Sequence, residues 1–302
     1  MHWRHKKYQP MIDINKLGAS LYVPLTKFKP TILFEKYPFI RSVIVDCEDS
    51  INEQDINLLQ SMVDIYLTKQ DGSKNDYNRF IFLRVRNSDH FKHVKIKGLS
   101  AFFHAIVLPK FSHKTGEKYI EHIEETDMIM PVIETDIFFE NDLKQTMETI
   151  EKISKQTLCL RIGANDILSF FGQRRQEDNT IYTNPVFSKY FTEIYIEAKR
   201  LKLPLSGPVF DYFSKISFSI LDQEVKQEIS YGILTKSAIH PNQVKHIQDN
   251  YQVSENDFIS SEEILNNNAP VSNVNMAMLE KVIHTSWAKG IQKRYFFYGL
   301  KK

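Results

Sequence analysis

Short apolar runs rich in β-branched residues alternate along most of the chain with longer amphipathic stretches. This alternation is typical of repeated βα units around a parallel sheet. Several runs, such as SVIV at 42–45 and AIVL at 105–108, are apolar at consecutive positions, as a sheet covered on both faces requires. Eight such runs are present, which is the number that closes a (β/α)₈ barrel. The predicted strands are 19–24, 42–46, 80–85, 105–109, 128–133, 158–162, 203–209 and 235–239.

Amphipathic stretches between these strands predict helices, for example at 54–67, 116–125, 139–155, 187–201 and 243–250. The predicted fold class is therefore α/β, a (β/α)₈ TIM barrel with a C-terminal helical extension. We place an N-terminal arm at 1–17, the barrel at 18–252 and the extension at 253–302. The extension is expected to pack over the barrel or against another subunit. A long polar connection at 172–185 interrupts the repeat and is expected to be functional or mobile.

Composition narrows the class of protein. The 302 residues are 42% hydrophobic, and their formal net charge of +2 includes no long block of like charge, so we expect no nucleic-acid partner. No stretch approaches the roughly 20 apolar residues that span a bilayer, and no apolar leader follows the basic start. Cys47 and Cys159 lie inside apolar runs, where free buried thiols are the ordinary expectation. A cytoplasmic location fits these features best.

Polar residues gather at the carboxyl ends of the predicted strands, which is the end of a barrel that carries active sites. Asp46 and Glu48 are two positions apart and should share one face of an extended chain. Arg84 and Arg86 have the same spacing after the third strand. Acidic and basic groups are thus expected to converge on one mouth. The candidate residues are Asp46, Glu48, Arg84, Arg86, Lys110, Glu134, Asp166 and Lys236, with Arg175 in the long loop.

This mixture suits metal-assisted chemistry on a carboxylate. Mg²⁺ takes oxygen ligands, typically one or two protein carboxylates completed by water and substrate oxygens, and Glu134 and Asp166 are the candidate pair. A guanidinium such as that of Arg84 can hold a substrate carboxylate through two parallel hydrogen bonds. Cleavage of a carbon–carbon bond beside a polarised carbonyl produces an enolate, whose charge the metal and cations would stabilise.

Plainer roles compete for each residue. Asp46, Glu48 and Glu134 could cap helices, and Asp166 could close an Asx turn. Arg84 and Arg86 could form internal salt bridges, because a buried arginine needs partners. Lys110, Lys236 and Arg175 could be solvated rim charges, although Arg175 beside Arg174 could also bind a phosphate or a second carboxylate. His240, placed before Pro241, is expected to support a turn.

Eight motifs in order also resemble the citrate lyase β-subunit and related HpcH/HpaI aldolases over roughly residues 18–250. They are LYVP (21–24), VIVDCEDS (43–50), FLRVRN (82–87), VLPK (107–110), VIET (132–135), GANDI (163–167), SGPVFD (206–211) and AIHPNQ (238–243). The resemblance implies that Glu134 and Asp166 are Mg²⁺ ligands, that Arg84 binds the substrate, and that Asp46 and Glu48 lie near the site. It also implies a homo-oligomer, a trimer or a multiple of one.

The chain departs from the family pattern at three places. Asn165 replaces the acidic residue of the family's GAEDL motif, Ser206 stands where an Asp often precedes Gly-Pro, and Arg86 is an additional arginine beside Arg84. The segments GQRR, TIYTNP, KSAIHPNQV and HTSWAKGI resemble more closely the TIM-barrel carbon–carbon bond lyases of bacterial tellurium-resistance and stress gene clusters.

The leading functional hypothesis is a Mg²⁺-dependent carbon–carbon lyase or aldolase. In this hypothesis the enzyme acts on a small carboxylate or acyl-CoA substrate through an enolate. In it Asp46 and Glu48 join Arg84 as catalytic residues, and Arg86, Lys110, Lys236 and Arg175 assist substrate binding. Two alternatives stay open: an acyl-CoA thioesterase or condensing enzyme on the same site, and a non-catalytic barrel that serves as a scaffold in a biosynthetic complex.

Overall fold

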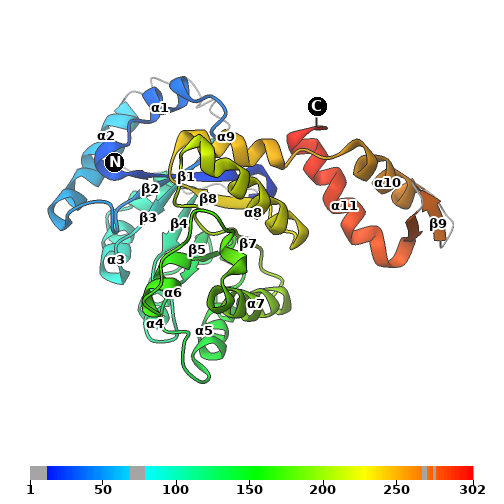
Figure 1. The fold of residues 1–302 in the computed structure, drawn as a ribbon. Coiled ribbons are helices and arrows are strands. Elements are labelled where there is room, and N and C mark those ends of the chain that lie inside the picture. Colours follow the sequence, from blue (N-terminus) through cyan, green and yellow to red (C-terminus); the bar gives the residue numbers. More distant parts are fainter. Residues whose placement is uncertain (1–11, 69–78, 267–270, 275–276, 302) are drawn as a thin grey trace.

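Eight parallel strands close into a barrel in the computed structural model, which describes residues 12–68, 79–266, 271–274 and 277–301 (Figure 1). The hydrogen-bonded order is β7-β6-β5-β4-β3-β2-β1-β8, and a parallel bridge between Gly207 and Lys236 brings β7 against β8. The predicted fold class is confirmed. The strands are β1 (Gly18–Pro24), β2 (Ser42–Asp46), β3 (Phe80–Arg84), β4 (Ala105–Leu108), β5 (Ile129–Ile133), β6 (Leu160–Ile162), β7 (Leu205–Ser206) and β8 (Thr235–Ala238).

Each predicted strand overlaps an observed one, with the largest difference at β7. That strand was predicted at 203–209 but pairs only at Leu205–Ser206. Pro208 follows shortly afterwards, and it has no N–H with which to continue the ladder.

Helices cover the outside of the barrel (Figure 1). The predicted helices at 187–201 and 243–250 correspond to α7 and α9, whereas those at 116–125 and 139–155 are shorter than expected. The helices of the barrel are α1 (Pro30–Lys36), α2 (Leu58–Thr68), α3 (Ser88–Ile96), α4 (Gly116–Ile120), α5 (Asp142–Glu151), α6 (Ala164–Phe170), α7 (Pro185–Arg200), α8 (Phe218–Ser230) and α9 (Pro241–Asn250). Short 3₁₀ turns include η1 (Ile14–Lys16), η3 (Glu53–Asn57) and η5 (Ile181–Thr183). Within the described residues, none of the helices has the length and apolar character needed to cross a membrane.

The core has two layers on the two faces of the sheet. A small cluster that includes Ile44, Phe82, Val107 and Met130 fills the barrel lumen. A larger cluster joins the outer face of the sheet to the helices. Side chains alternate between these layers along each strand, so a shift of one residue moves a side chain from the lumen to the helix layer.

The C-terminal extension is a helical hairpin that projects from the barrel (Figure 1). Its elements are α10 (Glu255–Asn266), the antiparallel strands β9 (Val271–Val274) and β10 (Ala277–Glu280), and α11 (Lys281–Tyr298). The end of α11 contacts residues that precede β1 and β2. Tyr298 Oη donates to the Asn15 carbonyl at 2.7 Å, and Arg41 Nη2 donates to the Phe297 carbonyl at 2.7 Å. The extension therefore attaches at the amino ends of the strands. Residues 1–11 of the predicted N-terminal arm lie outside the described residues.

Candidate active site

Arg84 joins two of the predicted acidic residues at the carboxyl end of the barrel. Its Nε and Nη2 atoms lie 2.6 and 2.8 Å from the two oxygens of Asp46, and its Nη1 atom lies 2.7 Å from Glu48 Oε2. Asp46 and Glu48 are both buried. Burial alone would raise the pKa of Asp46, but the hydrogen bonds and charge of Arg84 hold it below its ordinary value. Burial raises the pKa of Glu48, and the Arg84 and Lys110 charges offset part of that effect.

Glu134 follows β5 and is 3% exposed. Its Oε1 atom accepts a 2.6 Å hydrogen bond from the backbone N–H of Lys110, just after β4. Lys110 has a φ of 49°, a conformation that costs a non-glycine residue energy and is often found at functional sites. The Lys110 side chain reaches the other half of the site, with Nζ 3.1 Å from Glu48 Oε1. Lys110 therefore contacts both Glu134 and Glu48.

Asp166 lies in the first turn of α6, directly after β6, and is partly buried. The preceding Gly163 makes room for the Glu134 carboxylate: a Cβ atom there would lie 2.2 Å from Glu134 Oε2. Burial raises the pKa of Glu134 to about 8, and the nearby charges of Asp166 and Glu48 add to the effect. Burial also raises the pKa of Asp166, and Asp49 contributes. The structure thus brings two carboxylates together whose negative charges oppose one another.

Glu134 and Asp166 match the number and the kind of protein ligands that Mg²⁺ usually has. No group of three His, Cys, Asp or Glu side chains converges as a metal site among the described residues. Mg²⁺ does not need one, because it usually keeps several waters and binds through one or two carboxylates. A divalent cation between the two carboxylates would relieve their mutual repulsion.

Arg86 does not join the Arg84 cluster. Its Nη2 atom donates to the Ile51 carbonyl at 2.7 Å, and its backbone N–H donates to His90 Nδ1 at 3.1 Å. It borders an open cavity of about 960 Å³ between η3 and α3. Of the two arginines, Arg84 is therefore the one that contacts the acidic residues of the mouth.

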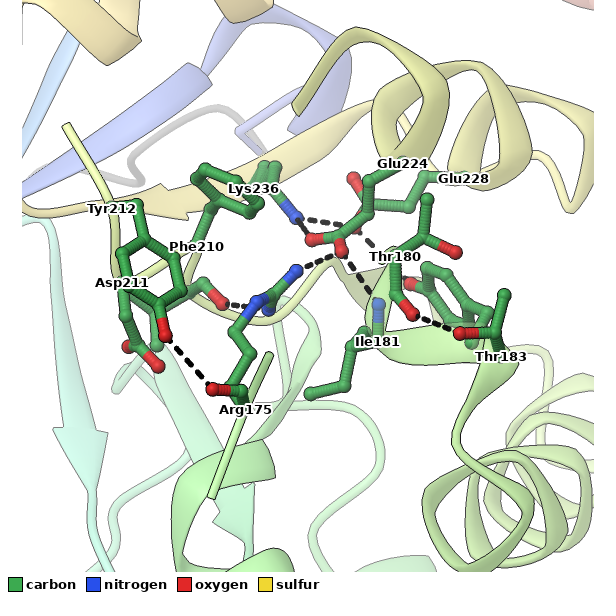
Figure 2. A network of polar contacts seen from close by, with 12 residues as sticks. Arg175, Thr180, Ile181, Thr183, Phe210, Asp211, Tyr212, Glu224, Glu228 and Lys236 are labelled. Atoms are coloured by element: carbon green, nitrogen blue, oxygen red, sulfur yellow. Dashed lines mark hydrogen bonds and ion pairs between the residues drawn. The ribbon is translucent and has the colours of Figure 1, made fainter. Parts of the chain in front are cut away.

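Lys236 and Arg175, both predicted to bind substrate, belong to a different network of polar contacts (Figure 2). Lys236 is fully buried, and its Nζ atom contacts Glu224 Oε1 at 2.8 Å and also contacts Glu228. Arg175 pairs with Glu224 and donates to the Val209 carbonyl at 2.7 Å. Because Glu224 and Glu228 belong to α8, Lys236 points to the helix layer and not to the lumen. Both cations therefore pair with acidic residues of α8, and neither contacts Arg84 or Glu134.

The remaining predictions have simple outcomes. His240 caps α9, with Nδ1 accepting from the Asn242 N–H, as expected of a turn-supporting residue. Asn165 is exposed and donates to Asp211 Oδ1 at 2.8 Å. Arg174 is exposed, unlike Arg175.

Two residues near the site were not singled out from the sequence. The Tyr22 ring on β1 lies 5.0 Å from the guanidinium carbon of Arg84 and 5.5 Å from that of Arg161 on β6. The available signal was a polar or aromatic residue inside an apolar strand, in LYVP and LRI. Aromatic residues are common in the cores of proteins, so the sequence pattern alone did not mark Tyr22 as a site residue.

The fold and the site define a (β/α)₈-barrel protein with a carboxylate-rich mouth centred on an ion-paired arginine. Residues 11–300 match the family described as C–C bond lyases of the TIM-barrel fold, and the chain belongs to this family. It is therefore a member of a family of carbon–carbon lyases. A comparison with curated proteins found no match.

Several solved structures share the fold. The Mycobacterium tuberculosis CitE protein in complex with magnesium, acetoacetate and coenzyme A is 16% identical, with a TM-score of 0.63 over 92% of this chain and 97% of that chain. A citrate lyase from Burkholderia xenovorans LB400 is 13% identical, with a TM-score of 0.69 over 96% and 94% of the two chains. The citrate lyase β-subunit of M. tuberculosis complexed with oxaloacetate and magnesium is 17% identical, with a TM-score of 0.58 over 80% of this chain and all of that chain.

Proposed function

We propose that the protein is a Mg²⁺-dependent lyase that breaks or forms a carbon–carbon bond beside the carbonyl of a small oxo acid, through an enolate. The observation that carries the proposal is the placement of Glu134 and Asp166 at the same mouth as Arg84. Belonging to a family of carbon–carbon lyases supports the reaction class. The acetoacetate and oxaloacetate bound with magnesium in the similar structures support the substrate class.

Glu134 and Asp166 would hold the metal ion, which, when bound, polarises the substrate carbonyl and stabilises the charge of the enolate. Gly163 leaves the Glu134 carboxylate the space it occupies, and the Lys110 N–H fixes one of its oxygens. These two contacts orient Glu134 before any ligand binds, and such preorganisation reduces the cost of reaching the reactive arrangement.

Arg84 would orient the substrate carboxylate. A guanidinium has five N–H donors, of which two donate to Asp46, while Nη1 forms an ion pair with Glu48. The N–H groups that do not donate to Asp46 can bind a carboxylate of the substrate. The two buried acidic residues hold the guanidinium plane in place, which maintains the geometry that the reaction needs.

The metal site is tested by stability measurements. The unfolding temperature of the wild-type protein should rise with Mg²⁺, because a ligand of the folded state stabilises it by mass action. Glu134→Gln and Asp166→Asn should lose the response, while Glu151→Gln, an exposed control, should keep it. Equal responses in all four proteins would exclude the proposed metal site.

The reaction is tested by incubation with oxo acids and with citryl and malyl thioesters, followed by analysis of the products. Carbon–carbon cleavage that depends on Glu134 supports the lyase. Release of free CoA without carbon–carbon cleavage would indicate thioester hydrolysis. Mg²⁺ binding without turnover of any of these substrates would favour a binding or scaffold role.

We also propose that the extension packs against a second copy of the chain. Val282 and Ile283 on α11 are 90% and 65% exposed, and Trp287 nearby is 41% exposed. Exposed apolar residues gathered on one element often mark an interface. Light scattering should give an oligomer for the wild-type protein and a smaller species for Val282→Asp/Ile283→Asp; a wild-type monomer would contradict the proposal.

A further inference from the structure

Arg161 is a buried cation that has only neutral neighbours. It is 1% exposed on β6. Its Nη2 atom donates to Ser237 Oγ at 2.8 Å, its Nη1 atom lies 3.9 Å from Met130 Sδ, and its Nε atom has no hydrogen-bond partner. Among the described residues, no carboxylate lies within 4.0 Å of it. An arginine side chain stays charged in proteins, and burying a charge without an opposite one is costly.

Two other buried cations of the barrel are paired with acids. Lys236 contacts Glu224 and Glu228, and Arg175 contacts Glu224, in the helix layer (Figure 2). The partly buried Arg84 contacts Asp46 and Glu48. Arg161 differs from them because none of the residues that the structure describes supplies an anion to it. The missing anion is therefore expected to come from a ligand.

The position of Arg161 places it beneath the proposed metal site. It lies on β6, two residues before Gly163, which directly follows the strand and packs against Glu134. Its strand partners are Val132, two residues before Glu134, and Ser206. Arg161 is thus one step deeper in the lumen than the carboxylate that would bind Mg²⁺.

Several serine side chains lie around Arg161 and make this part of the barrel interior polar. Bulky branched residues normally fill a barrel of this kind. Here Ser237 binds Arg161, Ser20 is in register with Ser237, and the hydroxyls of Ser20 and Ser42 are 2.8 Å apart. Ser206, in register with Arg161, is also buried. Small hydroxyl side chains beside an unpaired guanidinium are suited to a polar, anionic group.

Tyr22 connects Arg161 to the arginine proposed to bind substrate. Both guanidinium carbons lie within 5.5 Å of the centroid of its ring, so they are separated by no more than the sum of the two ring distances. Tyr22 is partly exposed, whereas Arg161 is not. The partly exposed Tyr22 ring therefore contacts both guanidinium groups.

We propose that Arg161 is a second anion-binding residue of the active site, which selects substrates that carry a second acidic group in addition to the carboxylate held by Arg84. This inference rests on the proposed function, because it takes Arg84 as the first anion-binding residue. The substrate class is then a small dianionic oxo acid, and the Tyr22 ring turns aside to admit the second group.

The test compares ligands that share a carbon chain and differ in one acidic group. Binding of 2-oxoglutarate and 2-oxopentanoate, and of succinate and butanoate, is measured by calorimetry with EDTA and again with Mg²⁺. We expect the wild-type protein to bind each dianion at least about tenfold more tightly than its partner. Arg161→Met should abolish that difference and leave the weaker affinity unchanged, whereas Arg84→Gln should weaken both ligands of a pair.

A second readout separates ligand binding from a structural role. Because Arg161→Met removes an unpaired buried charge, the ligand-free variant should unfold at a higher temperature than the wild-type protein. A lower unfolding temperature, no preference in the wild-type protein, or a preference retained in Arg161→Met would each overturn the proposal. If Arg161→Met does not fold, the charge is needed structurally and the proposal also fails. Absence of a Mg²⁺ response in the wild-type protein would instead refute the proposed metal site. The preference measured with EDTA tests Arg161 independently of that site.

Discussion

Arg84 binds Asp46 through two parallel contacts, Nε to Oδ1 at 2.6 Å and Nη2 to Oδ2 at 2.8 Å. Asp46 ends β2 and Arg84 ends β3, and the two residues are paired in the register of these strands. A two-point contact of this kind fixes the plane of the guanidinium as well as its position.

Asp46→Asn should therefore lower kcat/KM by about a hundredfold, because a small displacement of a positioning group can cost that much. Asp249→Asn is a suitable control, since Asp249 is an exposed carboxylate that pairs with Lys245 on α9. Steady-state kinetics on the substrate identified by product analysis provide the measurement. If the two variants were equally active, the catalytic position of the Arg84 guanidinium would not depend on Asp46.

Magnesium affinity should depend on pH through Glu134. Its pKa is raised to about 8 in the folded protein, so the metal-free carboxyl is largely protonated at neutral pH. Metal binding must displace this proton, and affinity should rise by up to about tenfold per pH unit below pH 8 and level off above it. Calorimetry in two buffers of different ionisation enthalpy measures the proton released.

The raised pKa of Glu134 also predicts how the stability of the metal-free protein changes with pH. Between the ordinary carboxyl pKa of 4.5 and about 8, folded Glu134 holds a proton that the unfolded chain has lost. Its contribution to stability therefore decreases as pH rises through this window. Glu134→Gln should flatten the decrease, and an unchanged profile in urea titrations at pH 5 to 8 would refute the assigned shift.

Gly163→Ala should damage the site without unfolding the barrel. The new Cβ atom would meet Glu134 Oε2 at 2.2 Å and displace the carboxylate, although the φ of −86° suits any residue. The Mg²⁺-induced rise in unfolding temperature should be lost. Gly290→Ala is the matched control, because a Cβ atom there meets nothing within 4 Å and alanine favours the helix. A full Mg²⁺ response in Gly163→Ala would show that the carboxylate has another place to bind.

Lys236→Met should destabilise the protein by about 3–5 kcal/mol, because it leaves Glu224 and Glu228 buried with too little positive charge. Lys245→Met, at an exposed pair, should change the free energy of unfolding by less than about 0.5 kcal/mol. Urea unfolding of both variants gives the comparison. If Lys236→Met proved as stable as Lys245→Met but bound substrate poorly, Lys236 would belong to the active site after all.

The sequence by itself determined the architecture and the acidic mouth of this protein. The alternation of apolar runs and amphipathic stretches predicts eight βα units, because a parallel sheet needs apolar strands and covering helices. Once strands are placed, parallel packing brings their carboxyl ends to one edge. Asp46 and Arg84 lie at the ends of predicted strands and Glu134 directly follows one, so their convergence could be expected from the sequence.

Only the tertiary structure decided which of the charged residues face that mouth. Lys236 and Ser237 are neighbours on β8, and the register with β1 turns Ser237 to the lumen and Lys236 to α8. Nothing local in the sequence sets this phase, because successive side chains simply alternate. Arg84 and Arg161 look alike within their strands, yet in the described part of the chain Arg84 contacts two carboxylates and Arg161 contacts none. Partners from distant strands make that difference, and they are known only when the barrel closes.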